Sequence, residues 1–305
     1  MSGLGAAGPA SLGDQVDGVI YVGTCGFAYK DWVGPFYAPK TKPLEMLAHY
    51  ARAFRAVEID STYYAVPSAR SVGSMVARTP PGFRFSFKAP HTVTHPPDPI
   101  GLNVHADAKL LLESIEPARD AGKLACVLLQ FPNAFKPEGN RETYVRRAVE
   151  SFEGVAVVVE FRNAQWQRPQ TMAMLEEVGA GYCNVDMPRL EGLLHPSADV
   201  SGSIGYVRFH GRNAKTWWRG TNVTRYDYLY TAEELQPWAD RIAEVEERAQ
   251  ETYVFFNNHA NGKSARNAEM MQALLDDRYG ESARAAVAHA AGGLPEQPGF
   301  QFNDP

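Results

Sequence analysis

Short apolar runs recur along the chain, and segments with helical periodicity separate most of them. The apolar runs are rich in β-branched and aromatic residues, which is typical of strands buried on both faces of a parallel sheet. They begin near residues 19, 56, 83, 124, 155, 181, 204 and 252. The amphipathic segments begin near residues 43, 68, 107, 141, 169, 231 and 264. The alternation predicts a repeated strand–helix unit.

Eight strands and seven helical segments between residues 18 and 280 predict an α/β fold, a single TIM-type (β/α)8 barrel, whose typical length is about 250 residues. An open doubly wound sheet is the competing architecture, but it normally has a glycine-rich phosphate loop after its first strand. The sequence "GTCGF" at 23–27 does not match that loop. We expect long loops after strands 3 and 7, and no helix within 187–202. Residues 1–17 are predicted to be a disordered tail and 281–305 a flexible one.

Composition and charge narrow the class of protein. The hydrophobic content of 45% suits one large core, and the net charge of -5 gives no general attraction to nucleic acid or anionic membranes. No apolar run approaches the roughly 20 residues needed to cross a bilayer. The first seventeen residues lack the features of a signal peptide, so we expect a cytoplasmic protein with no membrane partner. The three cysteines are too few and too scattered for a disulfide framework.

Polar side chains alternate with apolar ones where the predicted strands end. Residues two apart in a strand project from the same face, so Glu160 and Arg162 should point the same way. In a TIM barrel the carboxyl ends of all strands meet at one mouth, where active sites lie. The strand-end candidates are Glu58, Lys88, Gln130, Glu160, Arg162, Asp186, Arg208, His210 and Asn257. Convergence of acids, bases and cations makes a purely structural role for the whole set less plausible than a site.

Seven motifs in order resemble the YecE-like family of TIM-barrel proteins, the domain of unknown function 72. They are "VGTCGFAYKDWVGPFYAP", "VEIDSTYY", "FSFKAPHTVTH", "LLQFP", "VEFRNAQW", "YVRFHGR" and "YVFFNNHANGKSARNA", and they span about 19–278. The resemblance implies a barrel and a polar site, and it implies no reaction. The positions it marks are Glu58, Lys88, Gln130, Glu160, Arg162, Arg208, His210 and Asn257. Asn163 stands where the family commonly has histidine, so no role is carried over for that position.

The mixture of charges favours an enzyme that uses acid–base chemistry on a small anionic molecule, with phosphorylated molecules among the candidates, and the enzyme would be a hydrolase, a lyase or an isomerase. The expected catalytic residues are Glu58, Lys88, Glu160 and His210. The expected substrate-binding residues are Gln130, Arg162, Asp186, Arg208, Tyr226 and Asn257. Tyr226 belongs to a basic and aromatic loop with Lys215, Trp217, Trp218, Arg219 and Arg225 that could close over the substrate.

Other functions remain open. Glu58 and Glu160 could serve as a glycosidase pair, although neighbouring cations would keep both ionised, whereas the acid of such a pair needs a raised pKa. A divalent metal is a less favoured alternative, because no HxH or HExxH spacing occurs, and no cofactor is required by the sequence. Cys25 is a weak candidate nucleophile. A different class is a binding protein without catalysis, for a ligand or for nucleic acid, that uses the same loop.

Overall fold

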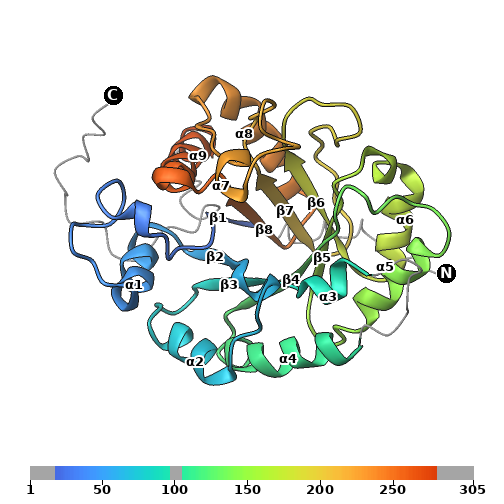
Figure 1. Cartoon of the computed structure of the whole chain (residues 1–305), viewed down its shortest axis with the longest axis horizontal. Coiled ribbons are helices and arrows are strands. Elements are labelled where there is room, and N and C mark those ends of the chain that lie inside the picture. Colours follow the sequence, from blue (N-terminus) through green and yellow to red (C-terminus); the bar gives the residue numbers. More distant parts are fainter. Residues whose placement is uncertain (1–17, 97–104, 280–305) are drawn as a thin grey trace, which may run out of the picture.

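Eight parallel strands close into a barrel in the computed structural model, which describes residues 18–96 and 105–279 (Figure 1). Each strand pairs with its sequence neighbours, and the eighth pairs with the first. The strands are β1 (Val19–Cys25), β2 (Ala56–Ile59), β3 (Arg84–Lys88), β4 (Leu124–Gln130), β5 (Val157–Glu160), β6 (Gly181–Asp186), β7 (Ile204–Phe209) and β8 (Glu251–Phe256). The predicted barrel and all eight predicted strands are confirmed.

The helices surround the barrel (Figure 1). They are α1 (Pro43–Ala53), α2 (Ala69–Ala77), α3 (His91–Thr94), α4 (His105–Asp120), α5 (Arg141–Glu150), α6 (Pro169–Glu177), α7 (Asn222–Arg225), α8 (Ala232–Glu246) and α9 (Lys263–Tyr279). No helix joins β6 to β7, where all residues are described, and this agrees with the prediction. The long connections after β3 and β7 carry the short helices α3 and α7. The predicted tails, 1–17 and 281–305, and part of the loop after β3 lie outside the described residues.

The interior of the barrel changes character from one end to the other. Near the amino ends of the strands, Tyr21 stacks on Tyr253 with ring centroids 5.1 Å apart, and Arg84 pairs with Glu251 at 2.8 Å. Near the carboxyl ends, charged side chains replace the aromatic ones. The register places Cys25 beside Glu58 and Gln130 beside Glu160, so the strand-end residues of neighbouring strands arrive at the same height. Closure of the barrel therefore gathers the strand-end side chains, among them Glu58 and Glu160, into one polar layer.

The outer faces of the strands pack against the helices. On β7, Phe209 meets the indole of Trp238 from α8 at 5.1 Å between ring centroids, and both side chains are fully or almost fully buried. A buried aromatic or large aliphatic side chain of this kind stabilises the fold by about 1.5–3 kcal/mol. The backbones of β1 and β2 approach each other closely at Gly23, where an added Cβ would lie 2.1 Å from the carbonyl oxygen of Ala56. A side chain at residue 23 would push β1 away from β2 and from Glu58.

Candidate active site at the barrel mouth

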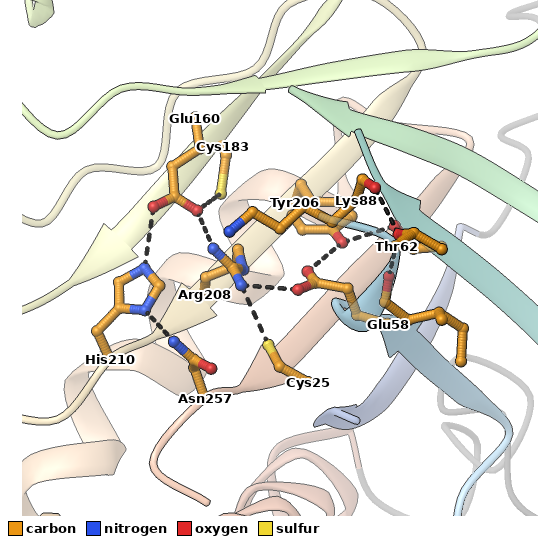
Figure 2. A network of polar contacts seen from close by, with 12 residues as sticks. Cys25, Glu58, Thr62, Lys88, Glu160, Cys183, Tyr206, Arg208, His210 and Asn257 are labelled. Carbon is orange, nitrogen blue, oxygen red and sulfur yellow. Dashed lines mark hydrogen bonds and ion pairs between the residues drawn. The ribbon is translucent and has the colours of Figure 1, made fainter. Parts of the chain in front are cut away.

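One guanidinium group joins two buried carboxylates at the centre of the polar layer. Arg208, on β7, donates from Nη2 to Glu58 Oε1 at 2.7 Å and from Nη1 to Glu160 Oε2 (Figure 2). Tyr206 donates its hydroxyl to the other oxygen of Glu58 at 2.8 Å. Both glutamates are 0% exposed. Since buried charges are tolerated only when they are paired and hydrogen-bonded, each group here is held by the others.

Glu160 has two further partners. Arg162 Nε donates to Oε1, and His210 Nε2 lies 3.1 Å from the same oxygen. Burial by itself would raise the pKa of Glu160, but Arg162, Arg208 and His210 together hold it well below its usual range. The predicted shared face of Glu160 and Arg162 is confirmed, and the lowered pKa favours the carboxylate form of Glu160.

His210 is neutral and fully engaged. Burial, together with the positive charge of Arg162, lowers its pKa to about 3. Its Nε2 faces the Glu160 carboxylate, and Asn257 Nδ2 lies 3.1 Å from its Nδ1 (Figure 2). The tautomer with hydrogen on Nε2 satisfies both contacts, because Asn257 can then donate to Nδ1. Neither nitrogen is left for a substrate.

The neutral state of His210 predicts a pH dependence of stability. Between pH 6.5 and about 4.5 the unfolded chain protonates this histidine and the folded chain does not, so the free energy of unfolding falls as the pH falls. The contribution is about 1.4 kcal/mol per pH unit. His210→Gln should be less stable at pH 7 and show a slope shallower by about that amount in urea unfolding. The exposed His105→Gln variant is the control, and equal slopes for both variants would contradict a buried neutral His210.

Above this layer the mouth opens into a cavity of about 540 Å³. That volume suits a small molecule. Six of the predicted site residues line the cavity, namely Lys88, Gln130, Arg162, Arg208, Tyr226 and Asn257. Glu58, Glu160 and His210 are not among its lining residues and belong to the buried layer. The structure thus divides the candidates into residues that a ligand could touch and residues that hold them in place.

Several titratable groups in the lining have shifted pKa values, and for two of them, Lys88 and Asp60, the shifts run in opposite directions. Burial, together with the positive charge of Arg208, lowers the pKa of Lys88. Burial, together with the negative charge of Glu58, raises the pKa of Asp60. Asp60 was not among the expected site residues, although its spacing from Glu58 placed the two on one face. A lysine with a lowered pKa is suited to act as a base, and a carboxyl with a raised pKa is suited to act as an acid.

The loop after β7 contributes one wall of the cavity. Trp217 is 4% exposed and packs edge-on against Tyr226, with ring centroids 5.9 Å apart. Asn222 donates to the hydroxyl of Tyr64 at 3.1 Å, which links α7 to the loop after β2. Burial by itself would raise the pKa of Tyr226, but Arg162, Lys88 and other nearby cations lower it. The wall therefore presents basic and aromatic groups to the cavity.

The lining also contains residues for which the sequence provided no specific signal. Tyr29, Tyr63, His95, Asn133 and His259 come from five loops that follow different strands. None of them stands in a strand, so the alternation of polar and apolar positions does not mark them. They are brought together only because all of these loops lie at the same end of the barrel.

Asp186 is placed differently from the expectation that it binds substrate, and this is a correction. It is 1% exposed and is not part of the cavity lining. It accepts hydrogen bonds from Tyr230 at 2.7 Å, from Trp238 at 2.8 Å and from Arg212 at 2.7 and 2.9 Å. The physical reason is the orientation of β6, whose inward-facing side chain here is Cys183, 3.8 Å from Glu160, so that Asp186 faces outward.

In the parts of the chain that the structure describes, we see neither an assembled set of metal ligands nor a Cys25 thiol suited to act as a nucleophile. No group of three or more histidine, cysteine, aspartate or glutamate side chains there is arranged to hold a metal ion. Cys25 is fully buried and lies 3.4 Å from Arg208 Nη2. Burial raises the pKa of this thiol well above its ordinary value, which opposes formation of the nucleophilic thiolate. In the same residues, no helix has the length and apolarity that crossing a membrane requires.

Comparison with known proteins defines the family. A family described as "Protein of unknown function DUF72" matches residues 21–291. The chain therefore belongs to the DUF72 family, as its resemblance to the YecE-like proteins predicted. It is similar to the UPF0759 protein YunF of Bacillus subtilis (strain 168), with 31% identity over 276 residues, which are 86% of this chain and 96% of YunF.

Crystal structures of two relatives support the fold. A DUF72 family protein from Thermotoga maritima MSB8 is 37% identical, with a TM-score of 0.77 over 85% of this chain and 99% of that one. A DUF72 family protein from Enterococcus faecalis V583 is 25% identical, with a TM-score of 0.75 over 85% of this chain and 96% of that one. These relatives show the barrel, and they carry no activity in their descriptions.

Proposed function

We propose that this protein is an enzyme that uses acid–base chemistry at the barrel mouth on a small substrate carrying a phosphate or carboxylate group. The observation that supports this most is a pair of unpaired cations in the cavity. Lys88 and Arg225 both line it, and neither makes an ion pair with any residue that the structure describes. Arg225 Nε is also buried without a hydrogen-bond partner in the described chain. An anion would satisfy Arg225, which stays charged whatever the protonation state of Lys88.

The buried layer does not neutralise these cations. Glu58 and Glu160 already accept from Arg208, and Glu160 also accepts from Arg162. The excess positive charge therefore lies above them, where the cavity opens. Amide side chains from Gln130 and Asn257 also line the cavity and could orient the uncharged part of the substrate.

The proton chemistry would belong to Lys88 and Asp60. The lowered pKa of Lys88 makes its neutral form available as a base, and the raised pKa of Asp60 makes its protonated form available as an acid. His210, Glu160 and Glu58 would then act as positioning residues that fix Arg162 and Arg208. A hydrolase and a lyase or isomerase both fit this arrangement. A glycosidase pair fits less well, because Glu160 is held as a carboxylate by two arginines.

The proposed function can be tested by measuring how much Arg225 contributes to anion binding. Wild-type protein should bind inorganic phosphate or pyrophosphate in calorimetry, and Arg225→Gln should weaken this binding about tenfold or more, since a hydrogen bond to a charged group contributes about 1.5–3 kcal/mol. Arg219→Gln is the matched control, because Arg219 is an exposed residue of the same loop outside the cavity lining. The proposal fails if neither anion binds, or if both substitutions reduce affinity equally.

A second candidate function is binding of single-stranded nucleic acid without catalysis. It is favoured by aromatic side chains at the rim of the cavity, where Tyr64 is 68% exposed and Trp218 is 54% exposed. Bases stack on such side chains, while nearby cations contact the phosphates. Salt-sensitive binding of an oligonucleotide that Trp218→Ala abolishes, together with no turnover of any small anion, would favour this function over the enzyme.

A further inference from the structure

We propose that Lys88 is a covalent catalyst, which forms an imine with the carbonyl carbon of an aldehyde or ketone that also carries a phosphate or carboxylate group. This inference rests on the proposed function, because the same cavity must bind the anionic group. It names the substrate class that acid–base chemistry alone leaves open.

The position of Lys88 suits a nucleophile. It is the last residue of β3, and its side chain lines the cavity. Thr62 donates its hydroxyl to the Lys88 carbonyl at 2.5 Å, which fixes the backbone at this point (Figure 2). The Nζ atom lies 4.2 Å from the centroid of the Tyr63 ring. An aromatic face positions the amine without accepting a proton from it.

Burial, together with the neighbouring guanidinium groups, favours the neutral amine, the form that attacks a carbonyl. The guanidinium groups of Arg208 and Arg162 oppose a third positive charge next to them. The carboxylates that would offset it, Glu58 and Glu160, are already bonded to those arginines. Desolvation beside other cations is a general way to activate a lysine for imine formation.

Lys123 shows what a structural buried lysine looks like in the same protein. It is 8% exposed, and its Nζ donates to the carbonyl of Val76 at 2.9 Å, the carbonyl of Thr79 at 2.7 Å and the hydroxyl of Thr79 at 3.0 Å. Its three hydrogens are thus used by oxygen acceptors, and it does not line the cavity. Lys88 has no such acceptors within the described part of the chain, so no oxygen there holds it as a hydrogen-bonded ammonium group.

The chemical step balances with groups that are present. The neutral Lys88 amine attacks the carbonyl carbon, a C–N bond forms, and the carbonyl oxygen becomes the hydroxyl of a carbinolamine by taking up the proton that nitrogen releases. Asp60 then donates its proton to that hydroxyl, which leaves as water and gives a protonated imine and a carboxylate. Hydrolysis reverses these steps, so no oxidant or reductant is needed. The positive imine would acidify a neighbouring C–H bond or promote C–C cleavage, which favours a lyase or isomerase.

Two aldehydes that differ only in the anionic group provide the test. Wild-type protein is incubated at pH 7 with glyceraldehyde 3-phosphate or with glyceraldehyde, reduced with cyanoborohydride and mapped by mass spectrometry. Burial beside Arg208 and Arg162 lowers the pKa of Lys88 and so increases its share of neutral amine, and Lys88 should therefore be modified faster than the exposed Lys109. Inorganic phosphate should protect Lys88 from the phosphorylated aldehyde. Modification of Lys88 no faster than of Lys109 would overturn the inference.

Two variants separate the covalent step from anion binding. Lys88→Arg keeps the positive charge, so it should still bind inorganic phosphate but should lose the reduced adduct, and Lys123→Arg should leave the adduct at Lys88 unchanged. If phosphate binds and no adduct forms at Lys88, the inference fails and the proposed function stands. If Lys88 reacts equally with both aldehydes and phosphate neither binds nor protects, the anion site fails while the reactive lysine stands.

Discussion

Arg208→Met is expected to destabilise the protein by about 3–5 kcal/mol, the typical cost of removing one partner from a buried ion pair. Arg208 is 1% exposed and serves Glu58 and Glu160 at once. Methionine fills much of the same space but leaves Glu58 with the Tyr206 hydroxyl and no cation at bonding distance. Urea unfolding at pH 7 measures the loss.

A matched surface pair and a change of pH identify the cause of that loss. Arg119→Met removes the exposed pair with Glu116 and should cost less than about 1 kcal/mol. Glu58→Gln in the Arg208→Met background should restore part of the stability, because it removes an unpaired buried charge. The deficit of Arg208→Met should also shrink as the pH falls, since the orphaned carboxylate then takes up a proton on folding. Equal losses for Arg119→Met and Arg208→Met would contradict a central role for this network.

Asp186→Ala is expected to cost about 3 kcal/mol or more in stability while leaving phosphate affinity unchanged. The substitution leaves the buried Tyr230 hydroxyl and Trp238 indole N–H without their acceptor, and each such group costs about 1–3 kcal/mol. Arg212 retains its contact with Glu234, at 3.3 Å, and its position over the Tyr230 ring, 5.5 Å from the ring centroid. Urea unfolding and phosphate calorimetry on the same samples measure the two effects.

Asp186→Asn provides the control for shape, because it keeps one acceptor oxygen and the volume of the side chain. It should be more stable than Asp186→Ala and bind phosphate equally well. Loss of phosphate binding in a variant that unfolds like the wild type would instead support the role in substrate binding that the sequence suggested. The two variants therefore distinguish a structural role of Asp186, which holds β6 and α8 together, from a role in ligand binding at the barrel mouth.

The site has two layers with different tasks. The lower layer neutralises its own charges through Arg208, Glu58 and Glu160, and it contains a histidine with no free nitrogen. The upper layer presents Lys88, Asp60 and Arg225 to the cavity. Buried groups that are paired with one another and hold the reactive ones at fixed positions are what an active site requires.

The local pattern of residues was sufficient to predict the barrel and many of the residues at its mouth. Apolar runs and helical periodicity predicted every strand and each of the longer helices, because burial on both faces of a parallel sheet leaves a strong compositional trace. The spacing of two residues placed Glu160 and Arg162 on one face, as the structure confirms. Closure of the barrel then implied that the strand ends meet, so Lys88 and Arg208 could be expected together.

Contacts between distant parts of the chain determine which of those residues a ligand can reach. Arg208 and Glu58 are 150 positions apart, and nothing local to either indicates that they neutralise each other. The outward orientation of Asp186 depends on how β6 sits between its neighbours, while Asp60 and Arg225 reach the cavity from the connections that follow β2 and β7. Burial and pairing are properties of the assembled barrel, and for that reason the division between supporting and accessible residues could be seen only in three dimensions.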